Sequence, residues 1–550
     1  MVGNRMRLRA GATALALAAG ALTACGDDSD SAPTPTTIPI DAGAGPARNP
    51  YLAADKYSVT HIDPANTDSF PDPVPRGTFH IDPAQMPRVP GGPVNVMTLA
   101  STSPDHRWVS STSGPRYVDV SGGGFRQVAS LDTPGVQPIS TQALDRVVDG
   151  QYTDTGQISD AIRQNWNGVD SERIGNGIYS VVDKDNRLYY VNQRAELFVF
   201  GLKNKNRPED GIEILARRDF VPLLTDSPTT LGTPEIIVGV GMTYDGHLVV
   251  LGSRSLYVLE RSLRGDPERL RVSDNETVSN SMAIDPFGGI YFASDKVMRK
   301  VVWKDGELST DTADGAWAAP YDYGRQPPSV KFGIGTGSTP ALMGWGDDEL
   351  VVLTDGADHM KLVAFWRNEI PDYAQPVEGA RSPRIAGQIP VTAGLREPLP
   401  EFIQSEQSVT VQGYGAFVVQ DVGAASSQDR LVDLLAIGPV SAPAYGVQRF
   451  EWDPIAHRWN SVWERGDVMS GSMVPGVSTT TGTVFVNGYY PADGWEVTGM
   501  DWHTGETVHR TIFGRTNRGN ASYSQCEAFP NGDLLFNSIS GPFRVKISEK

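Results

Sequence analysis

Cysteine, basic residues and long apolar runs are all scarce in this chain of 550 residues. Its two cysteines, Cys25 and Cys526, exclude a framework of several disulfides. Lys and Arg total 47 against 65 Asp and Glu, which gives a net charge of −18. A general nucleic-acid binder or a polybasic membrane protein needs a basic face, so neither is expected. No stretch after the N-terminal region approaches 18 consecutive apolar residues, so no transmembrane helix is expected there.

Turn-forming residues, by contrast, are abundant. The chain has 58 Gly and 40 Pro, and 39% of its residues are hydrophobic. This apolar content is enough to build a core, and the frequent turns favour an all-β fold.

The N-terminus has the pattern of a targeting segment. Arg5, Arg7 and Arg9 precede an apolar stretch at residues 10–21 that is too short to span a bilayer. The sequence Leu22-Thr-Ala-Cys25 that follows resembles the bacterial lipobox. That resemblance implies a lipoprotein signal peptide at 1–24 and lipidation of Cys25 with acyl chains such as palmitate. The alternative is an ordinary secretory peptide with an incidental cysteine.

The next segments divide the mature chain into a tether, an extension and a body. Residues 25–50 are rich in Asp, Pro, Thr and Gly and predict a disordered, lipid-anchored tether. Residues 51–95 form an N-terminal extension. The body at 96–550 repeats one pattern, in which an apolar strand enters a tight polar turn and further β-branched strands follow. Residues 178–200, 240–259 and 280–303 are the clearest copies.

Eight copies of this turn can be placed, and repeats of four strands are typical of β-propeller blades. The turns fall near Asp105, Asn186, Gly246, Gly288, Asp348, Gly415, Gly482 and Gly532. The sequence therefore predicts an all-β propeller of seven or eight four-stranded blades. The count is open because residues 96–132 form a weak copy, and a strand from before residue 96 could complete the short last copy and close the ring. A pair of β-sandwiches is the alternative fold, and helical spacing at residues 141–148 and 158–166 predicts a short helical insertion.

Two motifs in the body resemble known propeller families. Asn280, followed by Asp285-Pro-Phe-Gly288 and Ile290-Tyr-Phe, is similar to the blades of strictosidine-synthase-like and gluconolactonase-type propellers. The turn Asp501-Trp-His-Thr-Gly505 resembles that of quinoprotein-type blades. The first resemblance implies that Asn280 helps to bind a divalent metal in a central channel, and the second implies a quinoprotein-like redox enzyme.

The starts of the innermost strands should line the mouth of such a channel. Counting back from each turn gives the channel-lining candidates Asn176, Asn280, Thr339, Glu406 and Ser524. Hard cations such as Ca²⁺ prefer oxygen ligands of this kind, and Asn280 and Glu406 are the metal-ligand candidates. The alternative is that these polar side chains simply line a water-filled channel.

Motifs for nucleophilic or zinc chemistry are missing. The chain has no Gly-x-Ser-x-Gly elbow and no His-x-x-x-His pair among its eight scattered histidines. The glycine-rich segment 335–339 leads into a strand, so it lacks the helix N-terminus that binds phosphate. Cys526 is expected to be buried and inert.

These observations favour an extracytoplasmic, lipid-anchored β-propeller at the cell membrane. It would act as a binding module of the cell envelope for a small molecule or a protein partner, and nucleic acid is not expected as a partner. A secreted metal-dependent hydrolase or lactonase-like enzyme is the first alternative, and a quinoprotein-like oxidoreductase is the second. The sequence does not identify catalytic residues or a substrate.

Overall fold

The computed structural model describes residues 45–547 except 95, 167–168, 170–175, 225–228, 230–232, 329–330, 332, 424–425, 472 and 522. The chain divides into two units, Met1–Asp41 and Ala42–Lys550. The first unit, with the predicted signal peptide and Cys25, lies outside the described residues. Lipidation at Cys25 and localisation at the membrane therefore stay predictions.

The second unit is built from strands, which form eight sheets in the part of the chain that the structure describes. The first four sheets in chain order are mostly four-stranded. They comprise β3 (Met97–Ala100), β4 (His106–Ser110), β5 (Arg116–Asp119) and β6 (Arg126–Ser130); β7 (Ser180–Val182), β8 (Leu188–Val191), β9 (Glu196–Leu202) and β10 (Ile212–Asp219); β11 (Ile237–Met242), β12 (His247–Gly252), β13 (Ser255–Glu260) and β14 (Glu268–Arg271); and β15 (Val278–Ile284), β16 (Gly289–Ser294), β17 (Val297–Lys304) and β18 (Glu307–Ser309), with β19 (Trp317–Pro320) added beside β17.

The remaining four sheets continue the same up-and-down order. They comprise β20 (Ala341–Met343), β21 (Leu350–Thr354), β22 (Lys361–Trp366) and β23 (Ile385–Pro390); β24 (Thr410–Gln412), β25 (Gly415–Val419), β26 (Tyr445–Asp453) and β27 (Arg458–Met469); β28 (Gly476–Ser478), β29 (Thr483–Tyr490), β30 (Gly494–Asp501) and β31 (Thr507–Gly514), flanked by β1 (Ser69–Phe70) and β2 (Gly77–His80); and the three-stranded β32 (Cys526–Ala528), β33 (Leu534–Ser538) and β34 (Gly541–Val545).

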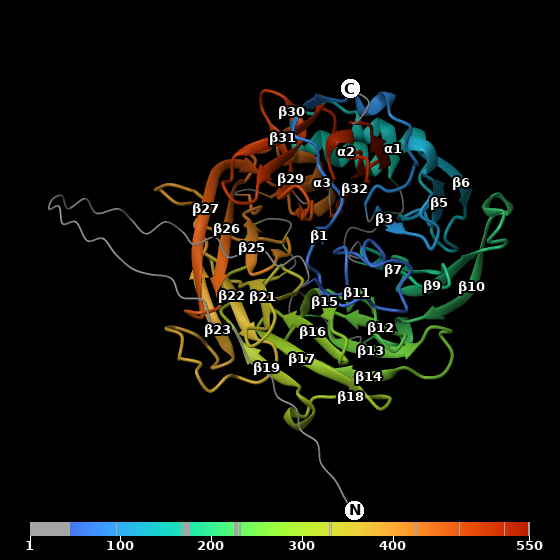
Figure 1. Ribbon diagram of the computed structural model, residues 1–550. Coiled ribbons are helices and arrows are strands. Elements are labelled where there is room, and N and C mark those ends of the chain that lie inside the picture. Colours follow the sequence, from blue (N-terminus) through green and yellow to red (C-terminus); the bar gives the residue numbers. More distant parts are fainter. Residues whose placement is uncertain are drawn as a thin grey trace, which may run out of the picture. The chain divides into compact units, whose positions relative to one another are not determined.

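The sheets are arranged around a common centre, which makes this unit a β-propeller (Figure 1). The first strand of each sheet lies toward the centre and the last toward the rim, as β7 and β10 illustrate. Most strands are buried on both faces because each sheet packs between two others. The predicted fold class is confirmed, and residues 96–132 form a four-stranded sheet of their own, β3–β6.

The repeated turn has a clear physical basis in the fourth sheet. Asp285 Oδ1 accepts the backbone N–H groups of Phe287 and Gly289 at 2.8 and 2.9 Å, and its Oδ2 accepts the Tyr291 hydroxyl at 2.7 Å. Gly288 has φ of 84°, a left-handed conformation that glycine adopts without strain. The turn therefore pins the first two strands together, which explains why its sequence recurs from sheet to sheet.

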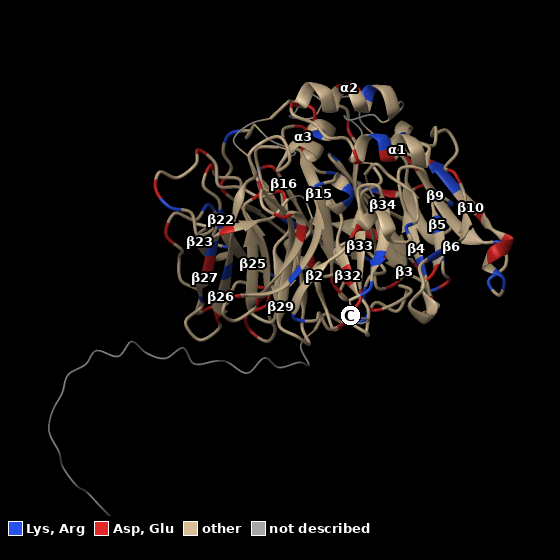
Figure 2. Cartoon of the chain, turned by 90° about the horizontal axis from the view of Figure 1, so that it is seen from above, with Lys and Arg blue, Asp and Glu red and all other residues tan. Residues whose placement is uncertain are grey.

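Helices gather on one face of the propeller unit (Figure 2). They are α1 (Thr141–Val148), α2 (Thr155–Asn165) and α3 (Arg430–Ala436). Each starts at a side-chain cap, Ser140, Asp154 or Asp429, as helices commonly do. The insertion at 141–166 was predicted, whereas α3 was not. Among the described residues, no helix is both long enough and apolar enough to cross a membrane.

The N-terminal extension runs through the centre of the propeller. We call residues 57–70 the channel segment. It ends in β1, which pairs in parallel with β28 and lies near the middle of the ring (Figure 1). Backbone hydrogen bonds of 2.7–2.9 Å join it to the first strands of six sheets. The donors are the N–H groups of Ala100, Val182, Ile284, Leu342, Val411 and Val477, and the acceptors are the carbonyl groups of Tyr57, Ser58, Pro64, Ala65, Thr67 and Asp68, respectively.

The rest of the extension passes from the centre to the rim. β2 pairs in parallel with β31, at the outer edge of the seventh sheet. On the last sheet, the extension makes one isolated bridge between Arg88 and Phe543, beside β34. The extension thus adds an inner and an outer strand to one sheet and a single bridge to the next.

Candidate functional site

The predicted channel-lining residues fall into two groups. Asn280 and Glu406 line a pocket at the starts of the innermost strands, and Thr339 is hydrogen-bonded to Asn280. Asn176 instead links two sheets, because its amide donates to the Gln193 carbonyl at 3.0 Å and its Oδ1 accepts the Ile237 N–H at 2.7 Å. Ser524 is buried and donates to backbone carbonyls of its own sheet and its approach loop.

The pocket is small and has both apolar and polar walls. Its cavity volume is about 40 Å³, which is room for a few waters or a ligand of few heavy atoms. Its apolar wall is made by Ile178, Ile236, Val238 and Val474. Its polar wall is made by Tyr179, Ser279, Asn280, Glu406, Gln407, Ser408 and Tyr523, together with Thr60 and His61 from the channel segment.

A buried histidine and aspartate from the channel segment face each other beside this pocket. His61 Nδ1 lies 3.2 and 3.1 Å from Oδ1 and Oδ2 of Asp68. His61 is 3% exposed and Asp68 is fully buried. His61 Nε2 makes no hydrogen bond to any residue that the structure describes. The pair therefore leaves one ring nitrogen without a hydrogen-bond partner among the described residues.

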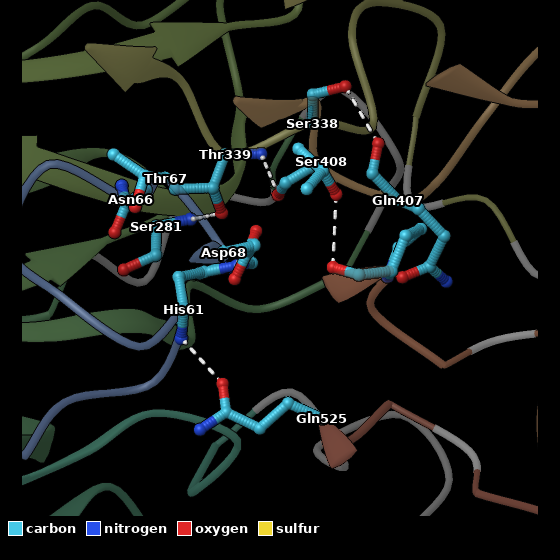
Figure 3. Close-up of polar contacts among 12 residues, drawn as sticks. His61, Asn66, Thr67, Asp68, Ser281, Ser338, Thr339, Gln407, Ser408 and Gln525 are labelled. Carbon is cyan, nitrogen blue, oxygen red and sulfur yellow. Dashed lines mark hydrogen bonds and ion pairs between the residues drawn. The ribbon is translucent and has the colours of Figure 1, made fainter. Parts of the chain in front are cut away.

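The backbone around His61 is held in an uncommon conformation. His61 and Ile62 have φ values of 68° and 72°, which is rare for any residue except glycine and especially for a β-branched one. The His61 N–H donates to Gln525 Oε1 at 3.1 Å (Figure 3), and the Tyr57 N–H donates to the Ile62 carbonyl at 2.7 Å. Such conformations cost about 1–3 kcal/mol each and persist where surrounding contacts fix them.

Burial governs the electrostatics of the pair. Loss of solvation raises the pKa of the Asp68 carboxyl, and the neighbouring His61 opposes that rise. The nearby Asp63 carboxylate adds to it, and the Lys56 ammonium, which lies 2.7 Å from Asp63, opposes it. The His61–Asp68 pair is thus part of a compact, nearly water-free group.

A hydrogen-bonded wall forms another side of the pocket. Asn280 Oδ1 accepts hydrogen bonds from the Tyr179 hydroxyl, from the Thr339 hydroxyl at 2.8 Å and from the Ser281 N–H at 3.0 Å. The Thr339 N–H donates to Ser408 Oγ at 3.0 Å. Burial raises the pKa of Tyr179, so its phenol stays neutral and remains a donor. These contacts fix the wall before any ligand arrives.

Ionisable groups lie behind Glu406. The Glu406 N–H donates to Asp421 Oδ1 at 3.0 Å, and Lys331 Nζ donates to Gln404 Oε1 at 2.7 Å. Burial raises the pKa of Asp421 to about 7 and lowers that of Lys331 to about 8. Nearby carboxylates, first that of Glu406, oppose the fall for Lys331.

The glycine-rich segment 335–339 packs against this region. A Cβ on Gly337 would lie 2.3 Å from the Ser405 carbonyl oxygen and 2.6 Å from Glu406 Cα. Glycine is needed there because two backbones approach closely. This agrees with a tight lead into β20 rather than a phosphate site.

Both predicted metal ligands, Asn280 and Glu406, lie in the lining of the pocket. No group of three or more His, Cys, Asp or Glu that could hold a metal lies within the described ranges. The amide oxygen of Asn280 already accepts three hydrogen bonds. Glu406 is the one carboxylate among the two predicted ligands. These residues do not match the oxygen cage that Ca²⁺ takes, and we derive no chemistry through a metal. The turn at Asp501 joins β30 to β31 and is not part of the pocket lining.

Sequence reasoning missed His61 and Asp68. The segment around them lacks the periodicity that marks a strand or helix, and many of its contacts are with distant residues, such as Gln525 and Val477. The one available signal was composition, since His61, Asp63 and Asp68 cluster in an otherwise poorly charged stretch.

Comparison with known proteins places the chain among its relatives. No family model matches it. Similar solved structures include a quinohemoprotein alcohol dehydrogenase from Comamonas testosteroni, with 12% identity, a TM-score of 0.49 and coverage of 92% of this chain and 79% of that one. A europium-containing methanol dehydrogenase has 10% identity and a TM-score of 0.48, with 88% and 89% covered. A putative 6-phosphogluconolactonase from Bacteroides fragilis has 11% identity and a TM-score of 0.38, with 76% and 95% covered.

One relative is similar in sequence over most of its length. It is a protein of Archaeoglobus fulgidus described as an uncharacterized protein, 30% identical over 408 residues. The alignment covers 71% of this chain and 75% of the archaeal protein. The chain therefore belongs to the same family as this archaeal protein.

Proposed function

We propose that this protein is an extracytoplasmic, lipid-anchored β-propeller that binds a small polar ligand in the pocket at its centre. The anchor rests on the n-region, the apolar stretch and the lipobox that ends at Cys25. The ligand site rests on one observation: polar side chains from several sheets and from the channel segment converge on a single pocket. Concave sites of this kind, with an apolar wall and a few fixed polar groups, are where small molecules bind.

A pocket-filling variant tests ligand binding. Ser279 lines the pocket, so Ser279→Phe should occupy it, whereas Ser262 is exposed at a turn after β13 and Ser262→Phe serves as the matched control. A library of small polar compounds is screened by thermal shift, because a ligand that binds the folded state raises its melting temperature. Compounds should stabilise the unmodified protein and the control but not Ser279→Phe. Equal shifts in all three proteins would contradict pocket binding.

A metal-dependent hydrolase with its site in the same channel is the second candidate. Asn280 and Glu406 lie in one pocket lining, but they do not supply the oxygen cage that Ca²⁺ takes, so this candidate has less support than ligand binding. Stoichiometric Ca²⁺ that is lost in Glu406→Ala and Asn280→Ala would support it. A metal-free protein whose melting temperature ignores chelator would rule it out.

A further inference from the structure

We infer that His61 is the hydrogen-bond acceptor for a hydroxyl group of a small neutral ligand in the central pocket, with Asp68 as its positioning residue. This inference rests on the proposed function, and it adds the chemical class of the ligand and the atom that recognises it.

Asp68 fixes the proton on the side of the ring that faces away from the ligand. Both carboxylate oxygens lie within 3.2 Å of Nδ1, and an ionised carboxylate can only accept hydrogen bonds. When Asp68 is ionised and the imidazole is neutral, the ring proton therefore sits on Nδ1, and Nε2, on the other side of the ring, keeps its lone pair. The same Asp–His arrangement orients catalytic histidines in other proteins.

The lone pair on Nε2 is buried without a protein partner. Nε2 makes no hydrogen bond within the described residues, although His61 is 3% exposed and lines the pocket. An unsatisfied buried polar group costs about 1–3 kcal/mol. A ligand hydroxyl that donates to Nε2 would remove that cost, which gives the ligand a specific source of affinity.

The ring is held rigidly before the ligand binds. Its backbone is in the left-handed conformation and its N–H is bound to Gln525, while the Ile62 side chain that follows is 1% exposed. The Tyr179 ring packs beside the imidazole at a centroid distance of 5.8 Å. Little conformational freedom is therefore lost on binding.

The charges around the pocket select against anions. Asp68 lies behind His61, and Glu406 is the carboxylate of the pocket lining. The cations nearby are Lys56, which pairs with Asp63, Lys331, which donates to Gln404, and Arg430, which interacts with Glu406 and Tyr523; none of these cations is part of the lining. A ligand with a negative charge would face repulsion at short range, so a neutral molecule with a hydroxyl donor fits best.

A pair of isosteric probes tests this assignment. 2-Propanol and acetone have the same number of heavy atoms, but only 2-propanol can donate a hydrogen bond. Crystals of the full-length protein are soaked separately in the two solvents near neutral pH. The 2-propanol oxygen should lie within hydrogen-bond distance of His61 Nε2, and acetone should not place its oxygen there. In His61→Phe the 2-propanol site at this position should be lost, whereas His503→Gln, at an exposed turn, should retain it.

The outcomes separate this inference from the proposed function. Acetone oxygen at Nε2 would mean that Nε2 carries the proton, which overturns the inference. Probes that occupy the pocket without contacting Nε2 would also overturn it while leaving ligand binding intact. Pockets that admit neither probe would contradict both. The comparison of the two solvents in the unmodified protein stands even if His61→Phe fails to fold.

Discussion

Replacing Phe70 by alanine should severely destabilise the propeller, because the channel segment forms part of its core. Phe70 is fully buried in β1, and its ring lies 5.5 Å from that of Phe485 and 6.0 Å from that of Tyr57. Removing a buried phenylalanine side chain costs about 3–5 kcal/mol through lost burial and the cavity left behind. We expect the free energy of unfolding to fall by that amount in Phe70→Ala.

Urea unfolding followed by tryptophan fluorescence measures this effect. The midpoint should fall with little change in the denaturant dependence. Phe287→Ala is the matched control, because Phe287 is 86% exposed and its loss should change the free energy of unfolding by less than about 0.5 kcal/mol. Phe70→Leu should give an intermediate loss. If Phe70→Ala and Phe287→Ala unfolded at the same urea concentration, the channel segment would be a loosely attached tether and the reasoning would be refuted.

Three further predictions follow from the sequence and from the buried ionisable groups. Cys25→Ser should release the protein from the membrane fraction or leave the precursor uncleaved, as fractionation and mass spectrometry would detect; unchanged membrane retention would contradict the anchor. Burial raises the pKa of Asp421 to about 7, so the folded protein keeps this carboxyl protonated while the unfolded chain ionises it as the pH rises from about 4 to 7, and the wild type loses stability across that window. Asp421→Asn avoids this, and its melting temperature relative to the wild type should rise from about pH 5 to about pH 8; a constant difference would count against it. Cys526 is 1% exposed and burial raises the pKa of its thiol, so it should react with a thiol reagent only after unfolding, whereas fast labelling of the native protein would exclude burial.

Most of the propeller could be predicted from the sequence, because short-range residue patterns mark its turns and strands. The Asp285 side chain binds backbone groups two and four residues later, and this short-range chemistry marks the turn between the first two strands of a sheet. Each of the eight predicted turns falls at the corresponding junction. The short helix α3 was not predicted, because its apolar residues are nearly continuous and show no helical periodicity.

The site was only partly predictable, for a physical reason. Counting along the inner strands found Asn280 and Glu406, since the same strand geometry recurs in each sheet. The count could not tell which side chains face the pocket, and Asn176 turned out to bind backbone groups instead. His61 and Asp68 lie in a segment whose only strand, β1, has two residues and pairs with β28, more than 400 residues away in the chain. Nothing local in the sequence specifies such contacts.

A crystal structure of the protein purified from its own membranes, with no ligand added, tests the central claim most directly. The account predicts electron density for a small polar molecule in the central pocket, in contact with His61 and the wall that carries Asn280 and Glu406. A pocket filled by the protein's own side chains, with His61 Nε2 hydrogen-bonded to one of them, would contradict it.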